Sequence, residues 1–95
     1  MATVLVKIRV ADFSAWKPVF DGSESLRREH GIEGHTIYRD HGDPNAVVMA
    51  LKTGDLARAQ EFVASDALRE VMMRAGVQGP PEITFCDDIE SKSYS

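Results

Sequence analysis

Hydrophobic and polar residues alternate at the start of the chain. Over residues 3–10 one phase is entirely apolar and β-branched, which is typical of a strand with one face in the core. That phase consists of Val4, Val6, Ile8 and Val10. The other phase carries Lys7 and Arg9 beside Leu5. This second face is therefore not purely apolar, unlike the first.

The spacing then changes from two residues to three or four. Three aromatic residues fall on one stripe of a helix: Phe13, Trp16 and Phe20. Pro18 is tolerated best in a first helical turn, which favours Ser14 over Asp12 as the N-cap. We expect the helix to continue past an irregularity at Gly22 and to end at Gly31.

Two further strands are predicted in the middle of the chain. Residues 33–39 and 46–52 are separated by a short segment, residues 40–45, that is dense in turn-forming residues. Strands joined by so short a turn form an antiparallel hairpin. Residues 46–52 are apolar in both phases, as in strands that are buried on both faces.

The second half of the chain predicts a helical segment and a last strand. Asp55 is placed to cap the helix, Ser65 to cap a following turn, and Gly76 to end it. This pattern is consistent with a helix pair or with one kinked helix. Residues 79–81, Gly-Pro-Pro, are expected to form a stiff connector before a strand at residues 82–89.

The resulting order, β-α-β-β-α-β, predicts a ferredoxin-like α+β fold. Right-handed crossovers give a four-stranded antiparallel sheet in the order 4-1-3-2, with the helices on one face. We expect residues 1–95 to form a single domain, with a polar, frayed tail at residues 91–95. Because the helices leave the other sheet face uncovered, we expect a homodimer that pairs through this face.

Composition narrows the classes of function. A chain of 95 residues buries only about 60–65% of its unfolded surface, so dimerisation would help it to fold. The net charge is -4 and the 11 basic residues are scattered, which argues against a nucleic-acid partner. No apolar run approaches the roughly 20 residues of a membrane helix, and no leader pattern opens the chain. With a single cysteine, Cys86, and no membrane segment, we expect a cytoplasmic protein.

Three segments carry a resemblance to a known family. Residues 11–21, 43–45 and 75–82 resemble those of small bacterial proteins described as antibiotic-biosynthesis-monooxygenase-like, or cyclase-like, dimeric α/β-barrel proteins. The resemblance spans nearly the whole chain and implies the ferredoxin-like fold and the dimer. Proteins of this architecture include cofactor-free monooxygenases, polyketide cyclases, haem-handling enzymes and stress-response proteins. The resemblance therefore implies no single reaction and marks no catalytic residue.

Two residues are the candidates for catalysis. His35 is the first candidate for a base, because imidazole titrates near neutrality. Arg9 is the candidate for stabilising an enolate, phenolate or carboxylate, because a guanidinium offers fixed donors. The alternatives are that His35 is a structural residue and that Arg9 pairs across the dimer with acids such as Asp87 or Glu82.

An aromatic-ligand pocket is the candidate binding site. Its predicted contacts are Trp16, Phe20, Tyr38, Phe62 and Met72. The alternative is that these side chains only pack in the core. Tyr38 lies on the opposite face of its strand from His35, so the two reach one pocket only across a bulge. The three histidines lack the spacing of metal ligands, and we expect neither a metal nor a cofactor.

Three functions follow from these patterns. The first is a cofactor-independent monooxygenase or cyclase that acts on a hydrophobic aromatic or polyketide-like molecule. The second is a non-catalytic small-molecule-binding or stress-related dimer. The third is a structural dimer whose own side chains fill the pocket, and a cavity no larger than about 300 Å³ would favour it.

Overall fold

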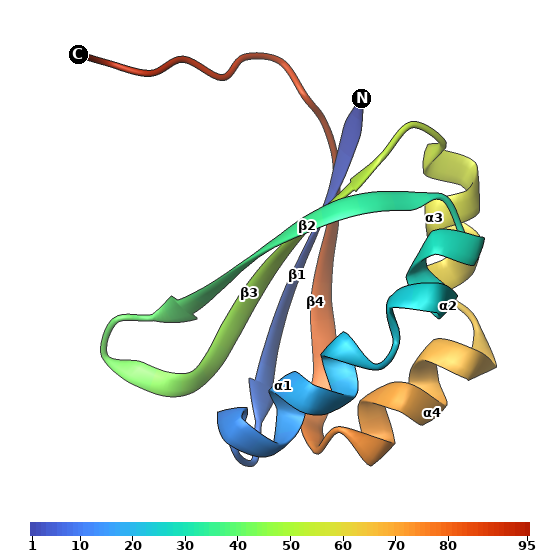
Figure 1. Ribbon diagram of the computed structural model, residues 1–95, viewed down its shortest axis with the longest axis vertical. Coiled ribbons are helices and arrows are strands. Elements are labelled where there is room, and N and C mark those ends of the chain that lie inside the picture. The colour runs from blue at the N-terminus through green and yellow to red at the C-terminus, as the bar shows by residue number, and fades with distance from the viewer.

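Four strands and four helices make up the protein, and the computed structural model describes all 95 residues. Their order is β1 (Ala2–Val10), α1 (Phe13–Asp21), α2 (Glu24–Glu29), β2 (Ile32–Asp40), β3 (Asp43–Thr53), α3 (Leu56–Val63), α4 (Asp66–Arg74) and β4 (Val77–Asp87). The strands form one antiparallel sheet in the order β2-β3-β1-β4, with the helices on one face (Figure 1). This is the predicted order 4-1-3-2 read from the opposite edge, and the ferredoxin-like α+β fold is confirmed.

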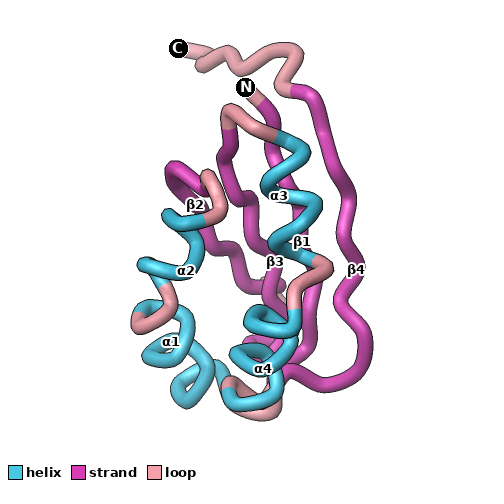
Figure 2. The backbone as a smooth tube through the Cα atoms, turned by 90° about the vertical axis from the view of Figure 1, so that its right-hand side faces the viewer, coloured by secondary structure: helices cyan, strands magenta, loops and turns pink.

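The core lies between the sheet and the helix layer, which Figure 2 shows in front of the strands. The apolar phase of β1 faces the helices, as its alternation predicts, and all four of its residues are buried. In the register with β3, Val4 pairs with Leu51, Val6 with Met49 and Ile8 with Val47. Two central strands thus contribute one continuous apolar surface, against which the helices pack.

The start of α1 differs from the prediction. The N-cap is Asp12, whose side chain accepts from the backbone N–H of Ser14. A contact with β3 helps to fix the start of this helix, because the Phe13 N–H donates to Asn45 Oδ1 over 3.1 Å. The prediction of Ser14 as the cap is therefore wrong, and Pro18 lies inside the helix rather than in its first turn.

The helical segment breaks where a glycine was expected to disturb it. α1 ends at Asp21, and α2 begins at Glu24 after Gly22 and Ser23. Gly31 follows α2 with a φ of 78°, a conformation that favours glycine. The predicted irregularity and the predicted end of the segment are both confirmed.

The second helical segment is a helix pair. The side chain of Asp55 accepts from the N–H of Arg58 and begins α3, and Ser65 Oγ accepts from the N–H of Leu68 and begins α4. Gly76 ends the segment with a φ of 80°. Both caps and this end were predicted, because capping depends on residues that are close in sequence.

The hairpin and the last strand are longer than predicted. Residues 41–42 form the whole turn between β2 and β3. β4 begins at Val77, so Gly79–Pro81 belong to the strand and the prediction of a separate connector is wrong. The pairing of β1 with β4 shifts register between Lys7 and Arg9. β4 is an edge strand, where prolines are tolerated at such an irregularity.

The second face of the sheet has no helix over it. Lys7 pairs with Val48, and Leu5 with Ala50, on this face. Val48 and Ala50 are half-buried, whereas Leu5 is exposed. Tyr38 shares the face because it pairs with Val48. The cations of β1 therefore point away from the helices, toward the surface that the sequence assigns to a partner copy.

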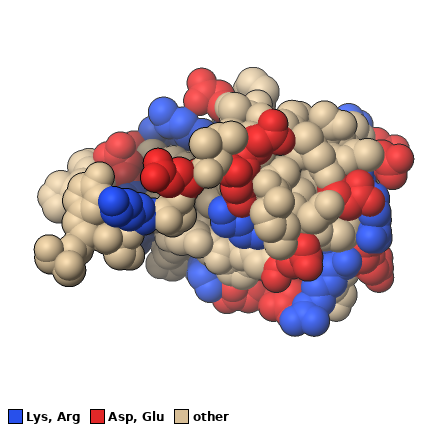
Figure 3. Space-filling model, turned by 90° about the horizontal axis from the view of Figure 1, so that it is seen from above, with Lys and Arg blue, Asp and Glu red and all other residues tan.

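The outer surface mixes charges of both signs. Basic and acidic side chains are interspersed on the face shown in Figure 3. None of the helices is long and apolar enough to cross a membrane. Residues 88–95 lie outside the helices and strands, and Figure 1 shows this segment extending away from the sheet.

Candidate ligand-binding cavity

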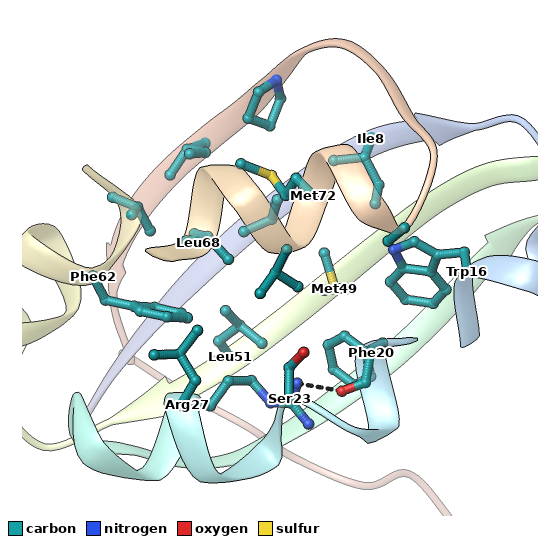
Figure 4. Close-up of a pocket in the computed structure, with 17 residues that line it drawn as sticks. Ile8, Trp16, Phe20, Ser23, Arg27, Met49, Leu51, Phe62, Leu68 and Met72 are labelled. Carbon is teal, nitrogen blue, oxygen red and sulfur yellow. Dashed lines mark hydrogen bonds between the residues drawn. The ribbon is translucent and has the colours of Figure 1, made fainter. Parts of the chain in front are cut away.

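An apolar cavity lies between the sheet and the helices. It has a volume of about 60 Å³, and 14 of its 17 lining residues are hydrophobic. Figure 4 shows Leu68 and Met72 of α4 on one side and Met49 and Leu51 of β3 on the other. The cavity therefore lies between α4 on one side and the two central strands, β1 and β3, on the other.

Aromatic side chains form part of this wall. The rings of Trp16 and Phe20 stack with centroids 5.0 Å apart, and Phe13 packs on Trp16 at 5.6 Å. The helical spacing of these residues places all three on one side of α1. Phe62 of α3 is only 1% exposed and also lines the cavity, as does Met72 of α4. Four of the five predicted ligand contacts thus meet in one wall: Trp16, Phe20, Phe62 and Met72.

One cation belongs to the same wall. Arg27 of α2 is only 5% exposed and is the one titratable residue that lines the cavity. Its Nη1 donates to the carbonyl oxygen of Phe20 over 2.7 Å, and its guanidinium lies 3.8 Å from the centroid of the Phe20 ring. Its Nη2 is buried and has no hydrogen-bond acceptor among the protein atoms. A guanidinium therefore lies at the edge of an apolar cavity, and the two N–H groups of its Nη2 have no acceptor in the chain.

Sequence reasoning missed Arg27, although a signal was present. Phe13, Trp16 and Phe20 are spaced by three and four residues, and Arg27 follows Phe20 by seven, which is two helical turns. On the continuous helix that the sequence predicts, Arg27 falls on the apolar stripe, although the break between α1 and α2 means that packing of α2 places it in the structure. A cation on an apolar stripe is a candidate for burial.

Two carboxylates act on the charge of Arg27. Burial lowers the pKa of Arg27, whereas Glu24 and Asp21 raise it. Both carboxylates are bound to other cations. Asp21 accepts from Lys17 over 2.7 and 2.8 Å, and Glu24 pairs with Arg28 over 3.0 Å. An arginine remains protonated even so, and Arg27 is a buried cation without a carboxylate of its own.

His35 lies beside the cavity rather than in its lining. Its ring meets the edge of Phe20 at a centroid distance of 4.9 Å and an angle of 88°. The imidazole is exposed and borders a second hollow of about 160 Å³, which we call the polar hollow. Its lining residues are Glu24, Arg27, Arg28, Ile32, Glu33, Gly34 and His35. Arg27 borders both spaces, and Phe20 separates His35 from the apolar one.

Arg9 and Tyr38 lie on the opposite face of the sheet. Arg9 Nη1 donates to Asp43 Oδ2 over 2.7 Å within the same chain. Hydrogen bonds from Arg9 and from the Asn45 N–H hold the pKa of Asp43 below its usual range. Tyr38 is 56% exposed. Within one chain, neither residue reaches the cavity that holds the other predicted contacts.

Comparison with known proteins bears on the fold. No family model matches this chain, and neither does any curated protein sequence. Solved structures match it over nearly its whole length. The fold is that of proteins named antibiotic biosynthesis monooxygenases. One with that name, from Bordetella bronchiseptica, has a TM-score of 0.79 at 13% identity, and the match covers 94% of this chain and 97% of that one.

Two further structures agree with this result. SnoaB of Streptomyces nogalater, a cofactor-independent oxygenase, has a TM-score of 0.75 at 15% identity, with 95% and 94% of the two chains covered. A Deinococcus radiodurans protein also named an antibiotic biosynthesis monooxygenase has a TM-score of 0.68 at 12% identity, with 100% and 99% covered. The resemblance seen in the sequence is confirmed at the level of the fold. At these identities the function has to be argued from the cavity itself.

Proposed function

We propose that the protein acts on a small hydrophobic aromatic or polyketide-like molecule as a cofactor-independent monooxygenase or cyclase. The observation that carries this proposal is the apolar cavity with Trp16, Phe20 and Phe62 in its wall. Binding sites for small molecules are typically lined by apolar and aromatic side chains with a few polar groups. The likeness of the fold to SnoaB supports the choice of reaction.

The size of the cavity sets a condition on this function. About 60 Å³ is well below the roughly 300–1,000 Å³ of sites for drug-sized ligands. α4 is the element best suited to move, because none of its residues is fully buried. Val71 and Met72 of this helix line the cavity and are only half-buried. We therefore infer that a substrate displaces α4 from the sheet.

The substrate itself supplies the electrons for this chemistry. Loss of a proton from a phenol or an acidic C–H gives an anion that dioxygen can oxidise. In a monooxygenation of a CH₂ group to a carbonyl, one oxygen atom enters the substrate, and the other leaves as water with the two hydrogens. In a cyclisation the same anion attacks a carbonyl group of its own molecule, and no oxygen is used.

The predicted catalytic residues fit this site unequally. His35 remains our proposal for the base, for a substrate that extends past Phe20 into the polar hollow. Arg9 and Tyr38 have no part in this cavity, because the sheet separates them from it. The cavity wall provides the binding surface and excludes water from the anion.

Oxygen uptake tests the reaction. We expect the protein to convert a hydroxylated anthrone, which has an acidic CH₂ group, to the quinone with one dioxygen consumed per substrate. V71W fills the cavity and should abolish the reaction, whereas M73W on the same helix should not, because Met73 is 75% exposed. A rate equal to that of heat-denatured protein would contradict enzymatic function.

The second candidate is a non-catalytic binding protein. The observation that favours it is that Arg27 is the only titratable residue lining the cavity, so no base lies there. This function predicts that a hydrophobic ligand raises the melting temperature without product formation. A structural protein with a self-filled cavity predicts neither effect, and the cavity volume of about 60 Å³ favours this third function because it lies below about 300 Å³.

The dimer is proposed on separate grounds. Val48 and Ala50 are half-buried and Leu5 is exposed on a sheet face that no helix covers. A second copy of the chain would remove this apolar surface from water. Sedimentation should give a mass twice 10.5 kDa at micromolar concentration. A mass of 10.5 kDa would refute the dimer.

A further inference from the structure

We propose that Arg27 is the anion-binding residue of the cavity, and that the ligand presents an ionised oxygen to its guanidinium as the cavity wall opens. The ligand class is then an apolar ring system that carries a phenolate, enolate or carboxylate. The inference rests on the proposed function, because it assumes that a hydrophobic molecule enters the cavity. It adds to the proposed function that the protein selects ligands with an ionised oxygen.

The hydrogen bonds of Arg27 show an unused donor. Nη1 has an acceptor in the carbonyl oxygen of Phe20, but Nη2 has none and is shielded from solvent. A buried donor without an acceptor costs about 1–3 kcal/mol, more for a charged group, and such donors are rare in native proteins. In Figure 4 the guanidinium lies against Phe20 and Ser23 at the edge of the apolar residues.

No carboxylate is in direct contact with the charge of Arg27, although Glu24 and Asp21 act on it from nearby. A buried cation is costly unless an anion pairs with it. The two nearby carboxylates are already bound, Asp21 to Lys17 and Glu24 to Arg28. The hydroxyl of Ser23, which also lines the cavity, donates to the carbonyl oxygen of Val19 over 2.8 Å. Glu33 lines the polar hollow beside Arg27 but forms no ion pair with it, so no carboxylate of the chain contacts the guanidinium, and an anionic ligand would supply that contact.

The position of Arg27 explains how a cavity without a base can favour an anion. Arg27 borders both the apolar cavity and the polar hollow, so a ligand oxygen beside it leaves the ring system among apolar side chains. A cation within about 4–6 Å lowers the pKa of an acidic group by 1–3 units. A phenol or enol bound here would lose its proton at lower pH than in water. The anion formed is the species that reacts in the proposed oxygenation or cyclisation.

Two probes that differ by one hydroxyl group test the inference. 4-Nitrophenol and nitrobenzene share an apolar ring, but only the phenol ionises, and its phenolate is coloured. Trp16 is the only tryptophan and stands in the cavity wall, so quenching of its fluorescence reports binding. We expect both probes to bind, and the pKa of bound 4-nitrophenol to fall by about one unit or more.

Two variants form a matched pair. R27M keeps an unbranched apolar side chain but removes the charge, and bound 4-nitrophenol should lose its pKa shift in this variant, with quenching by nitrobenzene showing that the cavity still takes up a ring. R69M removes an arginine of α4 whose side chain is 67% exposed and lines neither the cavity nor the polar hollow, and it should keep the shift. Equal shifts in R27M and the wild type would overturn the role of Arg27.

The wild-type titration alone also decides the matter if R27M fails to fold. Binding of both probes with no change in the pKa of 4-nitrophenol would refute the anion site and leave the hydrophobic cavity standing. Failure of both probes to quench Trp16 would refute the binding cavity and, with it, the anion site.

Discussion

The buried charge of Arg27 should also affect the stability of the fold, and replacing Arg27 with methionine tests this without a ligand. The variant removes the charge of a residue that is only 5% exposed, and it leaves an apolar side chain in the same space. If Nη2 has no acceptor within the chain, the arginine destabilises the fold. R27M should therefore be as stable as the wild type or more stable.

The magnitude follows from the contacts of the guanidinium. The variant loses the hydrogen bond to the Phe20 carbonyl, worth about 1 kcal/mol, but that oxygen still accepts from the Ser23 N–H over 3.1 Å. It also loses the stacking on Phe20, worth about 1–2 kcal/mol, of which a methionine sulfur restores roughly 1. Against this, it removes an unsatisfied donor worth about 1–3 kcal/mol and the desolvation of a charge.

The expected balance lies between no change and a gain of about 2 kcal/mol. For a domain of this size, 1 kcal/mol shifts the melting temperature by about 4–8 °C. Chemical denaturation and thermal melts at one protein concentration measure both quantities, since dimerisation would make stability depend on concentration. A loss of more than about 2 kcal/mol would show that Arg27 is a structural residue whose donors are satisfied, contrary to our reasoning.

Two controls separate charge from packing. R27A removes the charge and also the aliphatic stem, so it should be about 2 kcal/mol less stable than R27M. R28M changes an exposed side chain and should lie within about 0.5 kcal/mol of the wild type.

Three further substitutions test the core, the dimer and the acid response. Phe62→Ala should cost about 3–5 kcal/mol in chemical denaturation because it empties a buried site, and a cost below about 1 kcal/mol would mean that the cavity wall collapses freely. Val48→Lys should convert the dimer to a monomer in sedimentation, whereas Ala57→Lys on the exposed side of α3 should not; equal masses for the two variants would place the interface elsewhere. A hydrogen bond from Thr3 holds the pKa of Asp88 below its usual range, so this carboxylate stabilises the fold above about pH 4 and loses its effect as the pH falls through the lowered pKa. Asp88→Asn should flatten the fall in melting temperature below about pH 4, and an unchanged slope would show that this carboxylate does not contribute.

The order of the elements was readable from the sequence because it depends on local pattern. Two-residue alternation identified the strands, and the caps at Asp55 and Ser65 involve partners only three residues away. The handedness of crossovers then left one common topology. The start of α1 was misjudged because Pro18 was expected in the first turn but lies inside the helix, and because Asn45 of a distant strand also accepts a hydrogen bond there, from the N–H of Phe13. No rule based on neighbouring residues contains that contact.

The candidate site depended more on tertiary structure. The spacing of Trp16 and Phe20 was enough to predict an aromatic wall, but the faces of the sheet decided that Arg9 lies elsewhere. Arg27 and Arg28 are the same residue at adjacent positions of the sequence, yet one is 5% exposed and the other has a side chain 75% exposed. Burial depends on which side of α2 meets Phe20 and the sheet. Packing therefore decided which of two identical cations faces the cavity.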